Sequence, residues 1–74
     1  MHVDNLIRMA NQIGNFFEAM PDRAEAVRDA ALHIRRFWEP RMRHELLAHL
    51  DGAGVGELNP TMALAFSRHR DLVI

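Results

Sequence analysis

The stretch that decides the fold is Ile34-Arg35-Arg36-Phe37-Trp38-Glu39-Pro40-Arg41-Met42-Arg43. Pro40 has no backbone N–H, and its ring disfavours helical geometry at the preceding Glu39. One helix should therefore end near Trp38 or Glu39, and another should begin with Pro40 in its first turn. The sequence predicts a sharp corner between two helices at this point.

Both segments before this corner show the spacing of amphipathic helices. A first helix over residues 4–20 would be capped by Asp4. A second helix over residues 22–38 would begin at Asp22, which opens a capping box. Apolar residues recur at steps of three and four in both segments and predict a buried stripe on each helix. The first stripe comprises Leu6, Met9, Ala10, Ile13, Phe16, Phe17 and Met20, and the second comprises Val27, Ala30, Ala31, Ile34, Phe37 and Trp38.

Two further helices are expected after the corner. A third helix over residues 40–51 would end at Gly52, where a left-handed residue often closes a helix. The pair Asn59-Pro60 has the residue types of a cap and a first turn for a short fourth helix over residues 60–68. The pattern predicts a single all-α domain over residues 1–74, a small bundle of three amphipathic helices plus a short C-terminal helix.

Size and composition indicate a protein that needs a partner. In a chain of 74 residues, the entropy of ordering the chain roughly cancels what one small core contributes. The chain has no cysteine, which excludes disulfides and thiolate-bound zinc or iron–sulfur clusters, so a stabilising partner becomes the leading expectation. The lack of cysteine, of a signal peptide and of an apolar run of about 20 residues leads us to expect a cytoplasmic protein with no membrane segment.

No set of residues has the spacing of a catalytic or metal site. His44 and His49 are five positions apart and diverge by about 140° on a helix, whereas the zinc-protease pattern needs two histidines four apart. Ser67 is the only serine, and a lone serine near His69 does not make a catalytic triad. The glycines within residues 52–56 lack the strand and the lysine of a phosphate-binding loop. We expect no catalytic residue, no cofactor and no metal in this chain.

Seven residues are candidates for contact with a partner. Four arginines surround the corner, and two interpretations of them remain open: exposed side chains with weak ion pairs, or donors that bind carboxylates and carbonyls of a partner. Leu32 stands among charged residues, and Ile7 lies beside Gly14, whose missing side chain lets another backbone approach closely. Exposure of these apolar groups would favour self-association of the isolated chain. The candidates are Arg35, Arg36, Arg41, Arg43, Leu32, Ile7 and Gly14.

Several motifs resemble the delta subunit of bacterial NAD-dependent formate dehydrogenases. They all lie before Gly52 and are Asn5-Leu6-Ile7-Arg8-Met9-Ala10-Asn11-Gln12-Ile13-Gly14, Phe16-Phe17, Pro21-Asp22-Arg23 and the corner stretch that begins His33-Ile34. The resemblance implies a short helical chain without a redox cofactor of its own. It implies as partners a molybdenum-containing catalytic (alpha) subunit and the FMN and iron–sulfur subunits that pass electrons to NAD.

Two functions of different classes follow. The first is a non-catalytic accessory subunit of a cytoplasmic NAD-dependent formate dehydrogenase, docked on the catalytic subunit to support assembly or stability. The alternative is a small helical nucleic-acid-binding regulator, whose helices around Glu39-Pro40 imitate a helix-turn-helix. The net charge of −1 weighs against nucleic acid as a partner. A metal or cofactor-transfer chaperone is a third possibility, which the histidine spacing disfavours.

Overall fold

Five α-helices make up the fold in the computed structural model, which describes residues 2–74. They are α1 (Val3–Glu18), α2 (Arg23–Phe37), α3 (Pro40–Ala53), α4 (Pro60–Arg68) and α5 (Arg70–Val73). The described residues include no strand, and the predicted all-α bundle is confirmed. None of these five helices is long and apolar enough to cross a bilayer. The short α5 was not expected.

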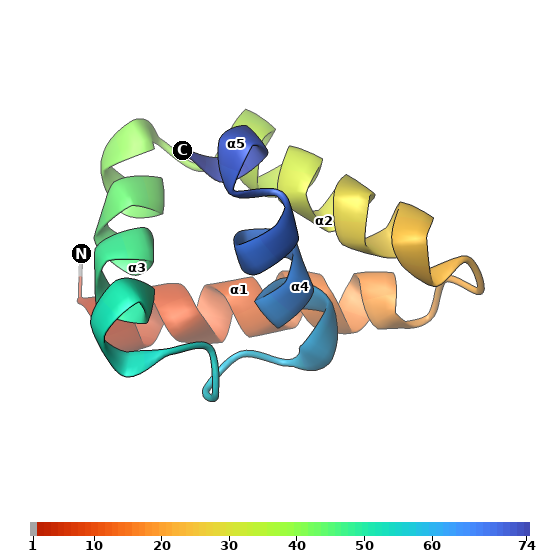
Figure 1. The fold of residues 1–74 in the computed structure, drawn as a ribbon, viewed down its shortest axis with the longest axis horizontal. Helices are drawn as coiled ribbons and strands as arrows, with labels where there is room; N and C mark the ends of the chain where they lie inside the picture. The colour runs from red at the N-terminus through yellow and green to blue at the C-terminus, as the bar shows by residue number, and fades with distance from the viewer. Residues whose placement is uncertain (1) are drawn as a thin grey trace.

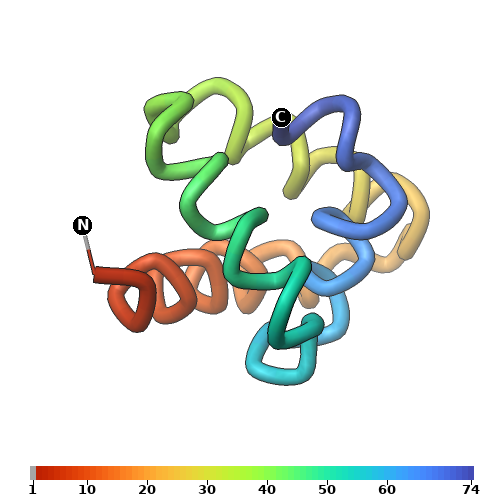
Figure 2. Tube along the Cα trace, turned by 60° about the vertical axis from the view of Figure 1, so that its left-hand side comes forward, coloured from red at the N-terminus to blue at the C-terminus, as the bar shows by residue number. Residues whose placement is uncertain are grey.

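The first three helices form a frame that surrounds α4 and α5 (Figure 1). α4 packs against both α1 and α2, and α5 packs against α2 and α4. α3 packs against α1 near the N-terminal end of that helix. The C-terminus lies close to the corner between α2 and α3 in both Figure 1 and Figure 2. α4 is thus the central element, and it contributes Met62, Ala65 and Phe66 to the core.

Side-chain caps begin three of the helices, and one cap differs from the prediction. His2, not Asp4, caps α1, because His2 Nδ1 accepts a hydrogen bond of 3.3 Å from the Asp4 N–H. Asp4 lies in the first turn, where its negative charge interacts favourably with the positive end of the helix dipole. Asp22 caps α2 and Asn59 caps α4 as predicted, each accepting from the backbone N–H three residues further on.

α3 runs further than the sequence suggests. It continues through Gly52 to Ala53, and Gly54 is the residue with positive φ, at 78°. The N–H of Gly54 donates to the carbonyl of Leu50 at 2.8 Å, which closes the last turn of the helix. The prediction of a left-handed Gly52 is therefore wrong, because Gly52 is an ordinary helical residue.

The predicted corner forms, and it separates two neighbouring aromatic residues. α2 ends at Phe37, Trp38 and Glu39 are extended, and Pro40 is the first residue of α3. Because Trp38 has left the helix, its indole lies in the core and is 5% exposed. Phe37 remains on the outer side of α2 and is 71% exposed, so its predicted place on the buried stripe is wrong.

α1 buries a different face from the predicted one. Its buried residues include Ile7, Ala10 and Gly14, whereas Phe16 is 73% exposed. At 100° per residue, Phe16 lies about 120° around the helix from Ala10. The apolar positions of α1 therefore cover more of its circumference than the core uses. The prediction that Ile7 and Gly14 lie on an exposed surface is wrong, because the rest of this chain covers that side of the helix.

Gly14 marks the point where α4 begins against α1. A Cβ atom at Gly14 would lie 2.5 Å from Cγ of Met62 and closer still to the side-chain amide of Asn59. The Asn59 N–H donates to Oδ1 of Asn11 at 2.8 Å, and its Nδ2 donates to the Asn11 carbonyl and to Oδ1 of Asn15, both at 3.1 Å. Gly14 therefore allows α4 of the same chain, rather than a partner, to approach α1 closely.

A second junction joins the end of α1 to the starts of α2 and α4. The hydroxyl of the buried Thr61 donates to the carboxylate of Glu18 and accepts from the guanidinium of Arg23, and the Thr61 N–H donates to the same carboxylate at 3.0 Å. Arg23 Nη1 also donates to the carbonyls of Phe17, Glu18 and Met20. The hydrogen bond from the Thr61 side chain, more than the charge of Arg23, lowers the pKa of Glu18.

The close contact of α1 and α4 at Gly14 predicts that a substitution favouring helix formation will nevertheless lower the stability of the protein. Alanine is the better helix former by about 1 kcal/mol, yet Gly14→Ala should destabilise the protein by about 1–3 kcal/mol, because the methyl overpacks Asn59 and Met62. Gly52→Ala is the matched control: Gly52 is helical with nothing within 4 Å of an added Cβ, and alanine there should stabilise by about 0.4–1 kcal/mol. Urea unfolding measures both. If both substitutions stabilised the protein, the close contact of Asn59 and Met62 with Gly14 would be contradicted.

The corner predicts opposite outcomes for its two adjacent aromatics. Trp38→Ala should cost about 3–5 kcal/mol, enough to unfold so small a protein, because the indole fills the core. Phe37→Ala should change the free energy of unfolding by less than about 1 kcal/mol, because most of the ring is in solvent. Thermal melting followed by circular dichroism compares them. Equal losses of stability for the two variants would contradict the placement of Trp38 in the core and of Phe37 in solvent.

The Thr61 junction predicts a loss of stability in acid. The folded-state pKa of Glu18 lies below its unfolded value of about 4.3, so the carboxylate stabilises the fold fully above that pH, and this contribution is lost as the pH falls through the folded-state pKa. Glu18→Gln should melt below the wild type at about pH 7, and the difference between the two melting temperatures should shrink as the pH falls below about 4. A difference that is independent of pH would contradict this role of Glu18.

Candidate partner surface

Four rings form a continuous row across α1 and α2. They are the phenyl rings of Phe16, Phe17 and Phe37 and the imidazole of His33, which we call the aromatic surface. The ring centroids of Phe16 and Phe17 are 5.1 Å apart, edge to face. Those of Phe17 and His33 are 6.0 Å apart, and those of His33 and Phe37 are 4.6 Å apart. These are the distances at which aromatic rings attract one another, so the row is a packed unit rather than four separate side chains.

The aromatic surface is apolar but largely open to solvent. Phe16 and Phe37 are each more than 70% exposed, while Phe17 and His33 are half-buried. The ring of His33 is half-buried because it is held between Phe17 and Phe37. Single exposed apolar residues are ordinary, but exposed aromatics joined into one patch are typical of interaction sites.

Two shallow hollows lie along this row, and Phe17 and His33 line both of them. The first hollow is almost wholly apolar, and the second mixes apolar and charged groups. The remaining residues of the first are Gln12, Ile13 and Phe16, and those of the second are Asp29, Leu32, Arg36 and Phe37. The row therefore continues on its α2 side into a charged border.

The four arginines of the corner divide into two pairs. Arg43 Nη1 donates to the carbonyl of Arg35 at 2.9 Å, which ties the start of α3 to the end of α2. Arg35 Nη1 donates to the carbonyl of Leu72 at 3.2 Å, which ties α2 to α5. Arg36 and Arg41 are exposed and make no hydrogen bond or ion pair with residues 2–74. The first pair holds the fold together, and the second pair remains free to meet another molecule.

The structure brings some of the seven predicted partner residues to the aromatic surface and removes others. Leu32, which is half-buried, and Arg36 both line the second hollow. Arg41 lies on α3, across the corner. Gly14 is covered by Asn59 and Met62, and Ile7 is only 7% exposed, at the hollow that Asn11 and Glu57 also line.

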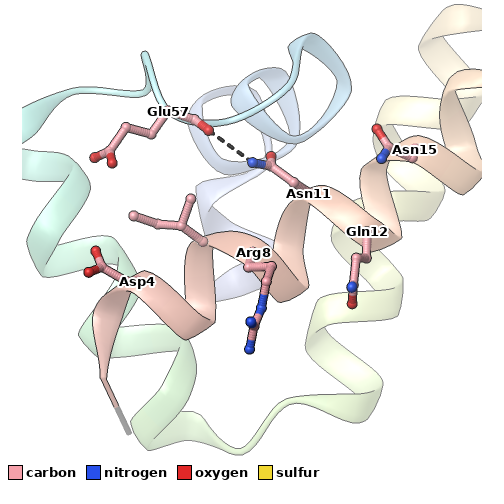
Figure 3. A pocket seen from close by; sticks show the side chains of 7 residues that line it. Asp4, Arg8, Asn11, Gln12, Asn15 and Glu57 are labelled. Carbon is pink, nitrogen blue, oxygen red and sulfur yellow. Dashed lines mark hydrogen bonds between the residues drawn. The ribbon is translucent and has the colours of Figure 1, made fainter.

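A polar hollow lies between α1 and the loop before α4 (Figure 3). Asn11 occupies it and donates from Nδ2 to the carbonyl of Glu57 at 2.9 Å, while its Oδ1 accepts from the Asn59 N–H. Arg8 Nη2 donates to Oδ1 of Asn5 at 3.0 Å. The hydrogen bonds of Asn11 attach the loop to α1, whereas the bond between Arg8 and Asn5 lies within α1. These polar groups do not converge on a position for a ligand.

The histidines and carboxylates gather into no metal site. His49 Nε2 lies 3.2 Å from Oε1 of Glu57, an isolated pair. Within the part of the chain that the structure describes, no three His, Cys, Asp or Glu side chains are close enough to hold a metal ion together.

The aromatic surface was missed by the sequence analysis, although the sequence carried a signal for it. The apolar residues of α1 occupy too many positions of the helical wheel to fit one buried stripe. The core takes the side with Ile7 and leaves the side with Phe16. For Phe37, the signal was Pro40, because a helix that ends before Trp38 cannot direct both aromatics inward.

A comparison with protein-family models identifies the family of the chain. The model for the NADH-dependent formate dehydrogenase delta subunit, FdsD, matches residues 5–66 and thus includes α4 as well as the motifs before Gly52. Searches of curated proteins and of solved structures found no significant match. Because the matched range covers most of its length, the chain belongs to the family of formate dehydrogenase delta subunits.

Proposed function

We propose that this chain is a non-catalytic accessory subunit of an NAD-dependent formate dehydrogenase, which docks on the catalytic (alpha) subunit and supports assembly or stability of the complex. The family match over residues 5–66 carries the proposal. The aromatic surface supports it, because a small protein with two phenylalanines more than 70% exposed has apolar area that a partner can cover.

The two pairs of arginines fit a docking role. Arg35 and Arg43 fix the shape of the corner through backbone carbonyls. Arg36 and Arg41 then point fixed positive charge away from the fold, and guanidinium groups bind carboxylates and carbonyls of a partner in two-bonded geometry. Leu32, next to Arg36 in the second hollow, adds an apolar contact.

In this proposal all redox chemistry belongs to the other subunits. The molybdenum cofactor, the iron–sulfur clusters, FMN and the NAD site are theirs, and this chain acts on them through packing alone. The described residues offer no gathered set of metal ligands, and the sequence has no cysteine. The NADH dependence that the family description states fits a complex that works in the cytoplasm.

No specific observation favours the alternative of a nucleic-acid-binding regulator. Two of the four corner arginines, Arg35 and Arg43, donate to backbone carbonyls of this chain rather than standing free for phosphates. The chain has ten acidic residues against nine basic ones. A duplex-binding surface needs an excess of positive charge on one face.

Expression of the dehydrogenase with and without this chain should separate assembly from stability. If the chain supports assembly, its omission should lower the molybdenum content per catalytic subunit; if it supports stability, molybdenum content should hold while the half-life of activity at elevated temperature falls. Metal analysis and timed inactivation of the purified complexes measure the two. The tagged chain should co-purify with the catalytic subunit, and the chain alone should carry no stoichiometric metal.

Two results would contradict the proposal. One is recovery of the tagged chain without any dehydrogenase subunit from its native host. The other is a complex made without the chain that matches the complete complex in both molybdenum content and half-life. Re-addition of purified chain to the deficient complex is the control, because it distinguishes a direct effect from altered expression.

A further inference from the structure

The end of α3 carries Asp51-Gly52, the one place in the chain where glycine follows aspartate. At such a pair the main-chain nitrogen of the glycine can attack the side-chain carboxyl of the aspartate. A bond forms between this nitrogen and Cγ, the Cγ–O bond of the carboxyl breaks, and the oxygen leaves as water with the amide proton. The product is a five-membered succinimide. Glycine favours this step because it has no Cβ to shield its nitrogen.

Hydrolysis of the succinimide can leave the main chain altered. Water opens the ring at one of its two carbonyls, which restores the original composition. Opening at the main-chain carbonyl leaves the nitrogen of Gly52 bonded to Cγ of Asp51, so the chain runs through the former side chain as isoaspartate. The main chain then contains one more carbon within the last turn of α3. That change would disrupt the closing hydrogen bond from the Gly54 N–H to the Leu50 carbonyl, which is 2.8 Å long.

The surroundings of Asp51-Gly52 leave both residues open to water. Every residue from Asp51 to Glu57 is exposed, and nothing lies within 4 Å of a Cβ atom added at Gly52. Helical geometry restrains the reaction, because the Gly52 N–H is directed at the preceding turn and is not free to close a ring. The last turn of a helix opens most readily, and glycine weakens it further. The helix alone therefore protects this pair incompletely.

A guanidinium from another helix holds the carboxylate of Asp51. Arg70 Nη1 donates to Oδ1 at 2.9 Å, and Nη2 donates to Oδ2 at 3.0 Å. Because both oxygens are bound, the carboxyl group is not free to turn towards the nitrogen of Gly52. The hydrogen bonds from Arg70, and less strongly its charge, also lower the pKa of Asp51. Only the protonated carboxyl releases water easily, so a lower pKa leaves less of the reactive form.

The position of Arg70 depends on the packing of α5. A helix of four residues is not stable by itself. Val73 is fully buried in the core, and Arg35 Nη1 donates to the carbonyl of Leu72 at 3.2 Å. These contacts fix α5, so Arg70 reaches Asp51 from an anchored element.

We propose that Asp51-Gly52 is a site of spontaneous isoaspartate formation, and that Arg70 of α5 restrains this reaction in the folded chain. The inference does not depend on the proposed function. Residues 70–74 lie outside the range that the family model matches. Protection of the last turn of α3 gives this terminal segment a role besides packing against α2 and α4.

Prolonged incubation of the purified chain at physiological temperature and neutral pH tests the proposal. Isoaspartate is counted by enzymatic methylation and located by peptide mapping. Arg70→Gln should raise the rate at Asp51 about two- to fivefold, the range that the energy of an exposed ion pair allows. Arg68→Gln is the matched control, an exposed arginine near the end of α4, and it should react like the wild type. Gly52→Ala should nearly abolish the reaction, because a methyl group shields the nitrogen.

Comparison of folded and unfolded chains shows whether the protection comes from the structure. In urea the wild type and Arg70→Gln should react at the same rate, and faster than either does when folded. Circular dichroism and melting verify that each variant is folded during the incubation. Arg70→Lys keeps a positive charge but loses the two-bonded geometry, and its rate should lie between those of the wild type and Arg70→Gln.

Three results would overturn the inference. One is an equal rate at Asp51 for the folded wild type and for both Arg70 variants. Another is isoaspartate that accumulates in the folded chain at other aspartates but not at Asp51. The third is an increase with Arg68→Gln as large as that with Arg70→Gln, which would show that the effect is not local to the pair of Asp51 and Arg70.

Discussion

The architecture depends on the close contact of α4 with α1 at Gly14. The frame of α1, α2 and α3 encloses apolar side chains that need a central element to cover them, and α4 supplies Met62, Ala65 and Phe66. A side chain at position 14 would hold this helix away from the frame. Asn59 fixes the contact, because the same residue caps α4 and binds the backbone of Asn11. Asn59 therefore links the start of α4 to its position against α1, and the hydrogen bonds of Thr61 to Glu18 attach α4 to α1 at a second point.

Local signals in the sequence were sufficient for the starts of α2, α3 and α4 but not for the buried faces of the helices. Pro40, Asp22 and Asn59 act on neighbouring backbone, so the corner and the caps of α2 and α4 follow from residue type alone. The exposed side of α1 depends on α4, which meets it across more than forty residues of sequence. Periodicity identified the apolar positions of α1, but the prediction assigned the wrong side of the helix to the core. Phe16 was predicted to be buried and is exposed, whereas Ile7 was predicted to be exposed and is buried.

The corner arginines show a second limit of inference from sequence. Arg35 and Arg43 are the same residue type as Arg36 and Arg41, and all four lie within nine positions. Their roles differ because the acceptors of the first pair are backbone carbonyls, of Leu72 in α5 and of Arg35 itself. Side-chain identity does not reveal such acceptors, and α5 was not expected. Neither interpretation that the sequence left open included this intramolecular role of Arg35 and Arg43, and contact of Arg36 and Arg41 with a partner stays a prediction.

The surplus of apolar surface links the stability of this chain to its assembly. A protein of 74 residues has little core to spare, yet two of its four phenylalanines lie largely in solvent. Any partner that binds the folded chain and not the unfolded one adds RT ln(1 + [L]/Kd) to the free energy of unfolding. Covering Phe16 and Phe37 in a complex would supply stability that the isolated core lacks, and no change inside the fold would be needed. In such a complex Phe16 and Phe37 would set how much of the chain stays folded, because the affinity for the partner determines that term.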